Sequence, residues 1–397
     1  MVAATPTAAQ EAGGADDGSA AAAADTRTQF PAFLLNSYFS VSVGSIAYGF
    51  SERQLEPGFS AQSIAVPHPA VRVALFGHEF NQYLSLQCTY LRPVRYVTYR
   101  DAGGELATHH VFTHFGGLTA KGRLPVTSRI ALYGEGGLGV TSRRGFTANG
   151  VPVVRDAHYA SILVGGGVEY HLDPAWDLTA GVTFSPSDTE EREPAATFVS
   201  AGFRYTMRPL PPEIVEANRR PRSVFPQGLI QVEYGTGVGY DINTFLSTKV
   251  PIFWGGNVKV DRGIGAHYER NVFHTAKIFA LDFGASVSTW RSKSNHDGFS
   301  TISVYPLFRF TLLRTKPADF YVSYSLAGPT YISQLILDDL DTGDHFTFQD
   351  FMGVGVFLGK NRHLTASMKI NHYSNGNIFT HNAGIKIPLT FGLGYVF

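Results

Sequence analysis

A histidine and a serine lie two residues apart near the end of the chain, where an alternating segment stops. From Leu364 to Ile370 the even positions are apolar, and the same series continues with His372 and Ser374. The odd positions up to Asn371 are polar. Alternation over this length predicts a β-strand with one apolar and one polar face. A serine that shares a face with a histidine is a candidate nucleophile, because the imidazole can take the hydroxyl proton.

A carboxylate interrupts the apolar face of the preceding segment. The even positions of residues 346–358 are apolar except for Asp350. A tight turn at 360–362 joins this segment to the next, and cross-strand partners must share a face. The simplest pairing across this turn places Asp350 directly opposite His372, and a shift by one pair leaves them diagonal neighbours. Opposed side chains have Cβ atoms about 4.5–5.5 Å apart, within reach of a carboxylate–imidazole hydrogen bond.

Two interpretations of Asp350 are open at this point. An unpaired carboxylate on a lipid-facing strand is costly, which favours a partner such as His372. In that case Asp350 orients the imidazole and selects the tautomer that accepts the serine proton. In the other interpretation the aspartate lies among lipid headgroups, where its exposure costs little. We favour the orienting role.

The composition predicts an all-β protein that crosses a membrane with strands. Of the 397 residues, 16% are charged and 13% are aromatic, with 42 glycines and 30 phenylalanines. The sequence has no long apolar run typical of a spanning helix. Many short alternating segments instead carry tyrosine and phenylalanine near their ends, as in transmembrane β-barrels. Only a helix or a closed barrel satisfies every backbone group in lipid.

The same composition argues against several classes of function. The formal net charge is zero, which gives no indication of nucleic-acid binding. Cys88 is the only cysteine, so an intrachain disulfide and a multi-cysteine metal site are excluded. Four aspartates within residues 338–344 could attract calcium, but a solvated acidic loop is the favoured interpretation. We expect no cofactor and no metal.

Two sets of about eight alternating segments predict two tandem antiparallel eight-stranded transmembrane β-barrels. The first set occupies residues 30–207, near 36–50, 68–79, 82–94, 109–123, 128–140, 157–172, 174–185 and 196–207. Its inner face would carry Glu135, Asp177 and Arg204, the polar filling of a small barrel. Residues 208–227 contain five prolines, so they form a periplasmic linker with a short helix at 213–219.

The second set occupies residues 228–397 and ends on an aromatic residue. Phe391, Leu393, Tyr395 and Phe397 alternate to the last position, which resembles the closing strand of bacterial outer-membrane proteins. Residues 203–207 resemble an internal copy of it, which favours two barrels over a single larger barrel. The first barrel resembles the OmpA-like small outer-membrane barrels. Residues 1–29 are mostly small and polar and are expected to be disordered.

Longer motifs in the second half carry a more specific resemblance. The run INHYSNGN at 370–377 is followed by Asn382, Gly384 and the closing GLGYVF at 392–397. The run HYERNVFHTAKIFALDFG at 267–284 and the run FRFTLLRTKPADFYVSYSLAGPTYIS at 308–333 extend the pattern. Together these segments resemble the PagL family of lipid A 3-O-deacylases over most of residues 228–397.

The resemblance implies an outer-membrane barrel that hydrolyses the ester at the 3-position of lipid A with a histidine-activated serine. Ser374 would then be the nucleophile and His372 the general base. Asn375 and Asn382 match asparagines implicated in holding the oxyanion. The backbone N–H of Gly376, in the same loop, can supply a further donor.

The sequence departs from the family pattern in one respect. The family orients its histidine with a glutamate on the last strand, but this chain has Lys386 near that position and no acidic residue after Asp350. Asp350 is therefore our candidate for the third member of a triad.

Strand direction adds a separate argument. In an eight-stranded barrel with periplasmic termini, the odd-numbered strands run outward, so the seventh strand would bring His372 and Ser374 to the outer leaflet that contains lipid A. We therefore expect an esterase of the bacterial outer membrane that acts on lipid A or lipopolysaccharide. The alternative is a non-enzymatic pair of barrels that anchors the membrane or binds lipopolysaccharide, with a degenerate hydrolase half. The missing late glutamate favours that alternative.

Overall fold

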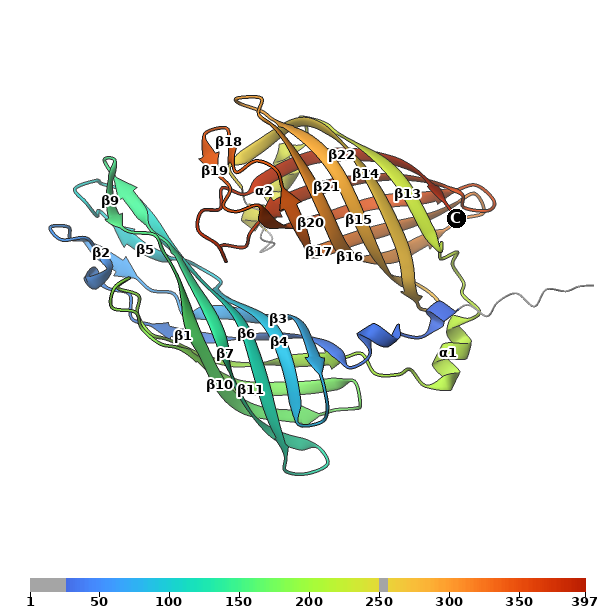
Figure 1. Cartoon of the computed structure of the whole chain (residues 1–397), viewed down its shortest axis with the longest axis horizontal. Helices are drawn as coiled ribbons and strands as arrows, with labels where there is room; N and C mark the ends of the chain where they lie inside the picture. Colours follow the sequence, from blue (N-terminus) through green and yellow to red (C-terminus); the bar gives the residue numbers. More distant parts are fainter. Residues whose placement is uncertain (1–25, 250–255) are drawn as a thin grey trace, which may run out of the picture.

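The computed structural model describes residues 26–249 and 256–397. It contains two closed barrels, each of eight antiparallel strands, which confirms the two-barrel prediction and excludes a single larger barrel (Figure 1). Among the described residues, no helix is both long and apolar enough to cross a membrane.

The first barrel closes through pairing of its fourth and fifth wall strands. In order around the wall, β6 pairs with β4, then β3, β1, β12, β11, β10 and β7, and β7 pairs back with β6. The wall strands are β1 (Ser37–Tyr48), β3 (Pro69–Glu79), β4 (Leu84–Pro93), β6 (Thr108–Pro125), β7 (Ile130–Arg144), β10 (Ala157–His171), β11 (Trp176–Ser185) and β12 (Ala196–Thr206). Four short strands lie in the connections: β2 (Ser63–Ala65), β5 (Val97–Arg100), β8 (Phe146–Ala148) and β9 (Val151–Val154).

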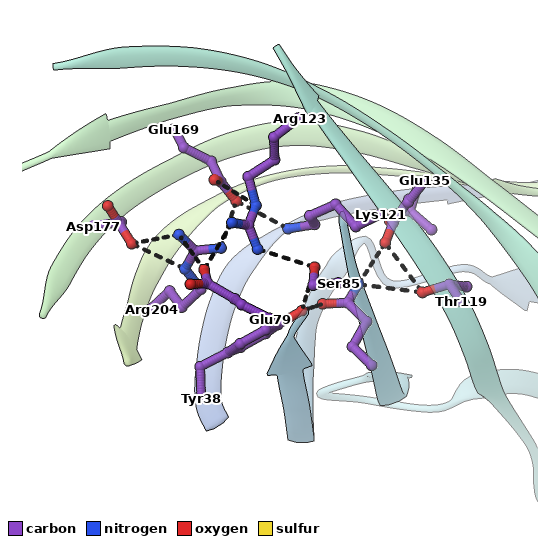
Figure 2. Close-up of polar contacts among 12 residues, drawn as sticks. Tyr38, Glu79, Ser85, Thr119, Lys121, Arg123, Glu135, Glu169, Asp177 and Arg204 are labelled. Atoms are coloured by element: carbon purple, nitrogen blue, oxygen red, sulfur yellow. Dashed lines mark hydrogen bonds and ion pairs between the residues drawn. The ribbon is translucent and has the colours of Figure 1, made fainter. Parts of the chain in front are cut away.

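Ion pairs fill the lumen of the first barrel. Arg204 contacts Asp177 at 2.6 Å and Glu169 at 3.2 Å, and Lys121 contacts Glu169 at 3.1 Å (Figure 2). Nearby, Glu135 accepts from the Gln87 amide at 2.5 Å. The inward-facing alternate positions of several strands therefore meet in one polar network, as the sequence predicted for Glu135, Asp177 and Arg204.

The second barrel has the same design. Its wall strands are β13 (Gly228–Gly235), β14 (Val258–His274), β15 (Phe279–Ser292), β16 (Gly298–Arg314), β17 (Ala318–Ile332), β20 (Phe346–Leu358), β21 (Leu364–Ser374) and β22 (Ile385–Val396). The first and last strands pair to close the wall, and Gly228 exchanges two backbone hydrogen bonds with Phe397 at 2.9 and 3.0 Å. The C-terminal aromatic thus seals the barrel, as its alternating pattern indicates.

Each barrel has long connections at one end and short turns at the other. In the second barrel, the long connections contain α2 (Tyr240–Lys249), β18 (Ile336–Leu337), β19 (Leu340–Asp341) and residues 375–384. We call this the loop end, and the opposite end, where α1 (Pro212–Asn218) lies, the linker end (Figure 1). β21 runs from the linker end to the loop end, so Ser374 finishes it beside the long loops.

The start of the described chain packs against the linker end of the second barrel. Of the segment 1–29 that was expected to be disordered, residues 1–25 lie outside the described residues. Thr26–Thr28 instead form the 3-10 helix η1, because Arg27 donates to the carbonyl oxygens of Phe225 and Pro226 at 3.1 and 3.0 Å. A second short helix, η2 (Ala32–Leu34), follows and leads into β1.

The acidic loop uses one of its carboxylates to hold a neighbouring turn. Asp338 accepts hydrogen bonds from the Ser292 hydroxyl at 2.6 Å and from the Asn295 N–H at 2.7 Å. Burial acts to raise the pKa of Asp338, but these donors and the N–H of Ser294 outweigh it, so the pKa lies below its usual value. The Asp338 carboxylate therefore accepts hydrogen bonds from groups of the protein itself.

Replacing Arg204 by methionine should destabilise the first barrel strongly. The change removes the cation that Asp177 and Glu169 share, and Glu169 keeps only Lys121 and Arg123 as ion-pair partners. Removing one partner of a buried ion pair costs about 3–5 kcal/mol. Urea unfolding of the detergent-solubilised protein measures the effect. The exposed Arg129→Met is the control, with a change below about 0.5 kcal/mol; equal effects of the two substitutions would contradict a structural role for the network.

Candidate active site

His372 and Ser374 lie on the outer wall of the second barrel. The alternate residues of β21 point into the lumen, where the Asn371 amide donates to Glu233 at 3.4 Å and the Tyr373 hydroxyl lies 3.0 Å from that of Thr301. Because side chains alternate along a strand, His372 and Ser374 project from the opposite face. His372 is nevertheless only 1% exposed, whereas Ser374 is half-buried.

Asp350 of β20 is the direct cross-strand partner of His372. This is the register that the tight turn and the shared apolar face predict. The Asp350 Oδ2 atom lies 3.8 Å from His372 Nδ1. This separation is within the range of an ion pair with a protonated imidazole and is longer than a hydrogen bond.

A strained backbone position fixes the other oxygen of Asp350. Its Oδ1 accepts a 2.6 Å hydrogen bond from the N–H of Ala327. Ala327 has a φ of 52° and lies where the register of β17 and β20 shifts between Ser325 and Gly328. A left-handed backbone conformation costs free energy for a residue other than glycine, and such residues are frequent at functional sites. Sequence reasoning missed this residue, although the Gly328–Pro329 step in the middle of a strand is a signal for a bulge.

The loop after β21 directs two N–H groups at the candidate nucleophile. The Ser374 Oγ accepts from the Gly376 N–H at 3.1 Å and from the Asn382 Nδ2 at 2.9 Å. Gly376 has a φ of 66°, which glycine adopts without strain. Asn382 also accepts from the Asn375 N–H at 3.3 Å, so it spans the loop.

Asn375 lies in the same loop, but its side chain faces elsewhere. Its Nδ2 donates to the His381 carbonyl at 2.7 Å and its Oδ1 accepts from the Asn377 N–H at 2.9 Å. The side chain is fully buried. Of the three sequence-predicted donors, Gly376 and Asn382 therefore meet Ser374, and the Asn375 side chain shapes the loop.

Lys386 of β22 is the partner of His372 on its other side. The histidine thus lies between a carboxylate on β20 and an ammonium on β22, with all three on one face. Lys386 is the residue that the sequence resemblance places near a glutamate of the family pattern.

An apolar groove of about 440 Å³ lies on the wall formed by β17, β20 and β21. Outward-facing Val354, Val356, Ala366 and Met368 line it. Val354 and Met368 are cross-strand partners, four residue pairs closer to the linker end than Asp350 and His372. The groove and the polar cluster therefore follow each other along the same pair of strands.

Within residues 26–249 and 256–397, no group of three or more His, Cys, Asp or Glu side chains is arranged to hold a metal ion. The polar cluster around Ser374 consists of a hydroxyl, an imidazole, a carboxylate and N–H donors, which is a set of groups suited to acyl transfer.

Two family models match the chain, one in each barrel. Residues 262–394 match the model of the lipid A 3-O-deacylase (PagL) family, and residues 55–207 match that of the OmpA-like transmembrane domain. These matches confirm the fusion predicted from the sequence. No curated protein matches the chain.

Several solved structures are similar to one barrel or more. The outer membrane enzyme PagL is 16% identical, with 42% of this chain and 97% of that chain covered and a TM-score of 0.30. Neisserial surface protein A is 16% identical, with 43% and 97% covered and a TM-score of 0.29. LpxR from Salmonella typhimurium is 9% identical, with 71% and 88% covered and a TM-score of 0.20.

The two family models and the two closed barrels place the chain among outer-membrane β-barrel proteins. The loop end is then the end that faces the outside of the cell, because outer-membrane barrels have long extracellular loops and short periplasmic turns.

Ala327→Gly should stabilise the protein by about 0.5–1 kcal/mol, because it relieves the left-handed backbone strain and keeps the N–H that Asp350 accepts. Ala285→Gly, on the regular strand β15, is the matched control and should destabilise by about 0.5–1 kcal/mol. Urea unfolding in detergent micelles measures both changes. Loss of stability in both variants would show that Ala327 is not strained.

Proposed function

We propose that the chain is an outer-membrane esterase that hydrolyses the 3-O-linked acyl chain of lipid A at the outer wall of its second barrel. One observation carries the proposal. In the barrel that matches the PagL model, His372 lies opposite Asp350 and two residues before Ser374, whose Oγ meets two N–H donors.

The proposed reaction is acyl transfer to serine followed by hydrolysis. His372 takes the Ser374 proton as Oγ attacks the ester carbon, and Asp350 stabilises the imidazolium that forms. The carbonyl oxygen becomes an oxyanion next to the Gly376 N–H and the Asn382 amide. Collapse of this intermediate breaks the ester bond, and the 3-hydroxyl of lipid A leaves with the proton from His372. Water then attacks the acyl-serine, with His372 again acting as base, and releases the free fatty acid.

The position in the membrane supports this substrate. Ser374 ends β21 at the loop end, on the outer wall, so a lipid of the outer leaflet reaches it from the side. The apolar groove runs along β20 and β21 away from the polar cluster. An ester at the cluster would therefore have its acyl chain directed along the groove into the hydrocarbon region, which keeps that chain out of water.

A second candidate function comes from a different class. Lys386 opposite His372 and the 3.8 Å separation of Asp350 and His372 favour a barrel pair without enzymatic activity, which binds lipopolysaccharide or anchors the membrane. The two functions differ in a direct measurement. An esterase releases one hydroxyacyl group from lipid A, whereas a binding protein leaves the mass of lipid A unchanged.

Ser374→Ala should abolish deacylation, with a loss of at least about 10³-fold in rate, because no other group can form the acyl-enzyme. Mass spectrometry of lipid A incubated with each protein gives the readout. Ser367→Ala is the matched control, since Ser367 lies on the same strand but faces the lumen, where its hydroxyl accepts from Gln231 at 2.8 Å. Intact lipid A after incubation with the wild type would favour the non-enzymatic function.

Asp350→Ala should lower the rate by about 10²–10⁴-fold while the protein still folds as a barrel, because His372 loses the group that orients it. The exposed loop residue Asp344 supplies a control, Asp344→Ala, with an unchanged rate. Adding Lys386→Glu to Asp350→Ala should restore part of the activity, since the carboxylate then approaches His372 from β22. A near-normal rate of the single Asp350→Ala variant would reject the assignment.

A further inference from the structure

The first barrel contacts the loop that carries the N–H donors of Ser374. The hydroxyl of Tyr90 on β4 donates to the Gly376 carbonyl oxygen at 3.0 Å, across 286 positions of sequence. A Cβ added to Gly116 on β6 would lie 3.8 Å from the Ile378 side chain, so a small side chain at this position would reach van der Waals contact with the loop. Both contacts fall on residues 376–378, directly after the candidate nucleophile.

The contact surface belongs to the outer wall of the first barrel. On β4, Gln87 and Thr89 face the lumen, where they bond Glu135 and Arg72, so Tyr90 faces outward. On β6, Thr119 is a lumen residue that bonds Gln87. His114 and Gly116, an odd number of residues away, therefore face outward as well.

Burial along this wall marks the area that is covered. Outward-facing Leu118 is 49% exposed. His114, two residues before Gly116 on the same face of β6, is only 3% exposed. The His114 ring stacks beside that of Tyr90, with centroids 5.8 Å apart, and the next residue across the wall is Ser142, which is 8% exposed. Polar side chains are unfavourable on a lipid-facing wall, so this patch fits a polar protein segment better than lipid.

The linker end supplies a second contact between the barrels. The ring of Phe30, just before β1, lies 4.4 Å from that of Phe273 on β14, and Phe33 lies 5.7 Å from Phe283 on β15. Phe30 and Phe273 belong to an apolar cluster with Leu34 and Leu281, and Phe283 packs against it. The two barrels are therefore joined near both ends, which limits how far the first barrel can move relative to the 375–384 loop.

We propose that the outer wall of the first barrel is the docking surface for residues 376–378 and that Tyr90 is a positioning residue for the proposed esterase. The positioning role of Tyr90 rests on the proposed esterase function, whereas the docking does not. Gly376 has the backbone freedom of glycine at a φ of 66°, and its N–H points at Ser374. The Tyr90 hydroxyl restrains this residue from the other side, so the first barrel keeps an oxyanion donor in place. This gives a physical reason for the fusion of two barrels.

A disulfide cross-link tests the docking without any assay of activity. In the full-length chain with Cys88→Ser, the pair Gly116→Cys and Ile378→Cys should oxidise readily in the membrane and become protected from a maleimide reagent. The pair Val199→Cys and Ile378→Cys is the control, because exposed Val199 lies on β12, across the barrel from β6. Equal cross-linking of the two pairs would overturn the docking, whether or not the chain is an esterase.

Tyr90→Phe tests the positioning role, because it removes one hydroxyl and keeps the ring. The kcat for lipid A deacylation should fall about three- to tenfold, as expected for one hydrogen bond, with KM within about twofold of the wild type. Tyr83→Phe, which changes an exposed tyrosine of the same barrel, is the control and should leave both constants unchanged. An unchanged kcat in Tyr90→Phe would overturn the positioning role. If the wild type has no esterase activity, this role falls with the proposed function, and the cross-link alone decides the docking.

Discussion

The hydrogen-bonded register between β20 and β21 is the interaction on which the candidate site depends. Every backbone group of a membrane-spanning sheet must find its partner in the sheet, so neighbouring strands cannot slip freely. A slip by one residue would also turn the apolar face of the slipped strand into the lumen. The pairing of Asp350 with His372 is thus fixed by the ladder of the wall. It does not depend on the side chains finding each other.

The same alternation separates the structural charges from the candidate chemistry. In both barrels, the inward positions carry ion pairs, such as Arg204 with Asp177 and Arg309 with Glu269 at 2.5 Å. These networks link adjacent and next-but-one strands inside the lumen and fill it, as expected for barrels of eight strands. A site that meets a lipid must then lie on the outer wall or in the loops. The cluster around Ser374 lies where these two regions join.

Much of the fold could be predicted because a period of two is easy to detect in a sequence. The strands, including the last one with its terminal aromatic, and the register across the 360–362 turn follow from that period, and the linker follows from its prolines. The bulge at Ala327 could not be placed this way, because an added residue breaks the pattern on which the prediction relies. The sequence identified Asn375, Gly376 and Asn382 as candidate hydrogen-bond donors, but the path of the backbone determines which of their N–H groups faces Ser374. The turn at Gly376 directs an N–H at the hydroxyl and leaves the Asn375 side chain to the loop.

The contact between Tyr90 and Gly376 could not be predicted from the sequence, because it joins the wall of one barrel to a loop of the other. The alternating pattern of each barrel gives no indication that the two are in contact. A polar residue on an otherwise apolar outer face was the available signal, and His114 on β6 is an example. The order of residues 26–28 had no such signal, because it comes from the partners of Arg27 in the linker and the second barrel.

The proposed use of Asp350 as the orienting acid has a simple geometric basis. Each strand of a barrel has two neighbours, so a histidine on β21 can receive a carboxylate from β20 or from β22. Here the carboxylate is on β20 and a lysine is on β22. In the proposed mechanism the lysine repels the imidazolium that forms as Ser374 attacks, so Asp350 must offset that repulsion as well as orient the ring. The Asp350 carboxylate is arranged to meet this demand, with one oxygen bound to the backbone N–H of Ala327 and the other 3.8 Å from His372.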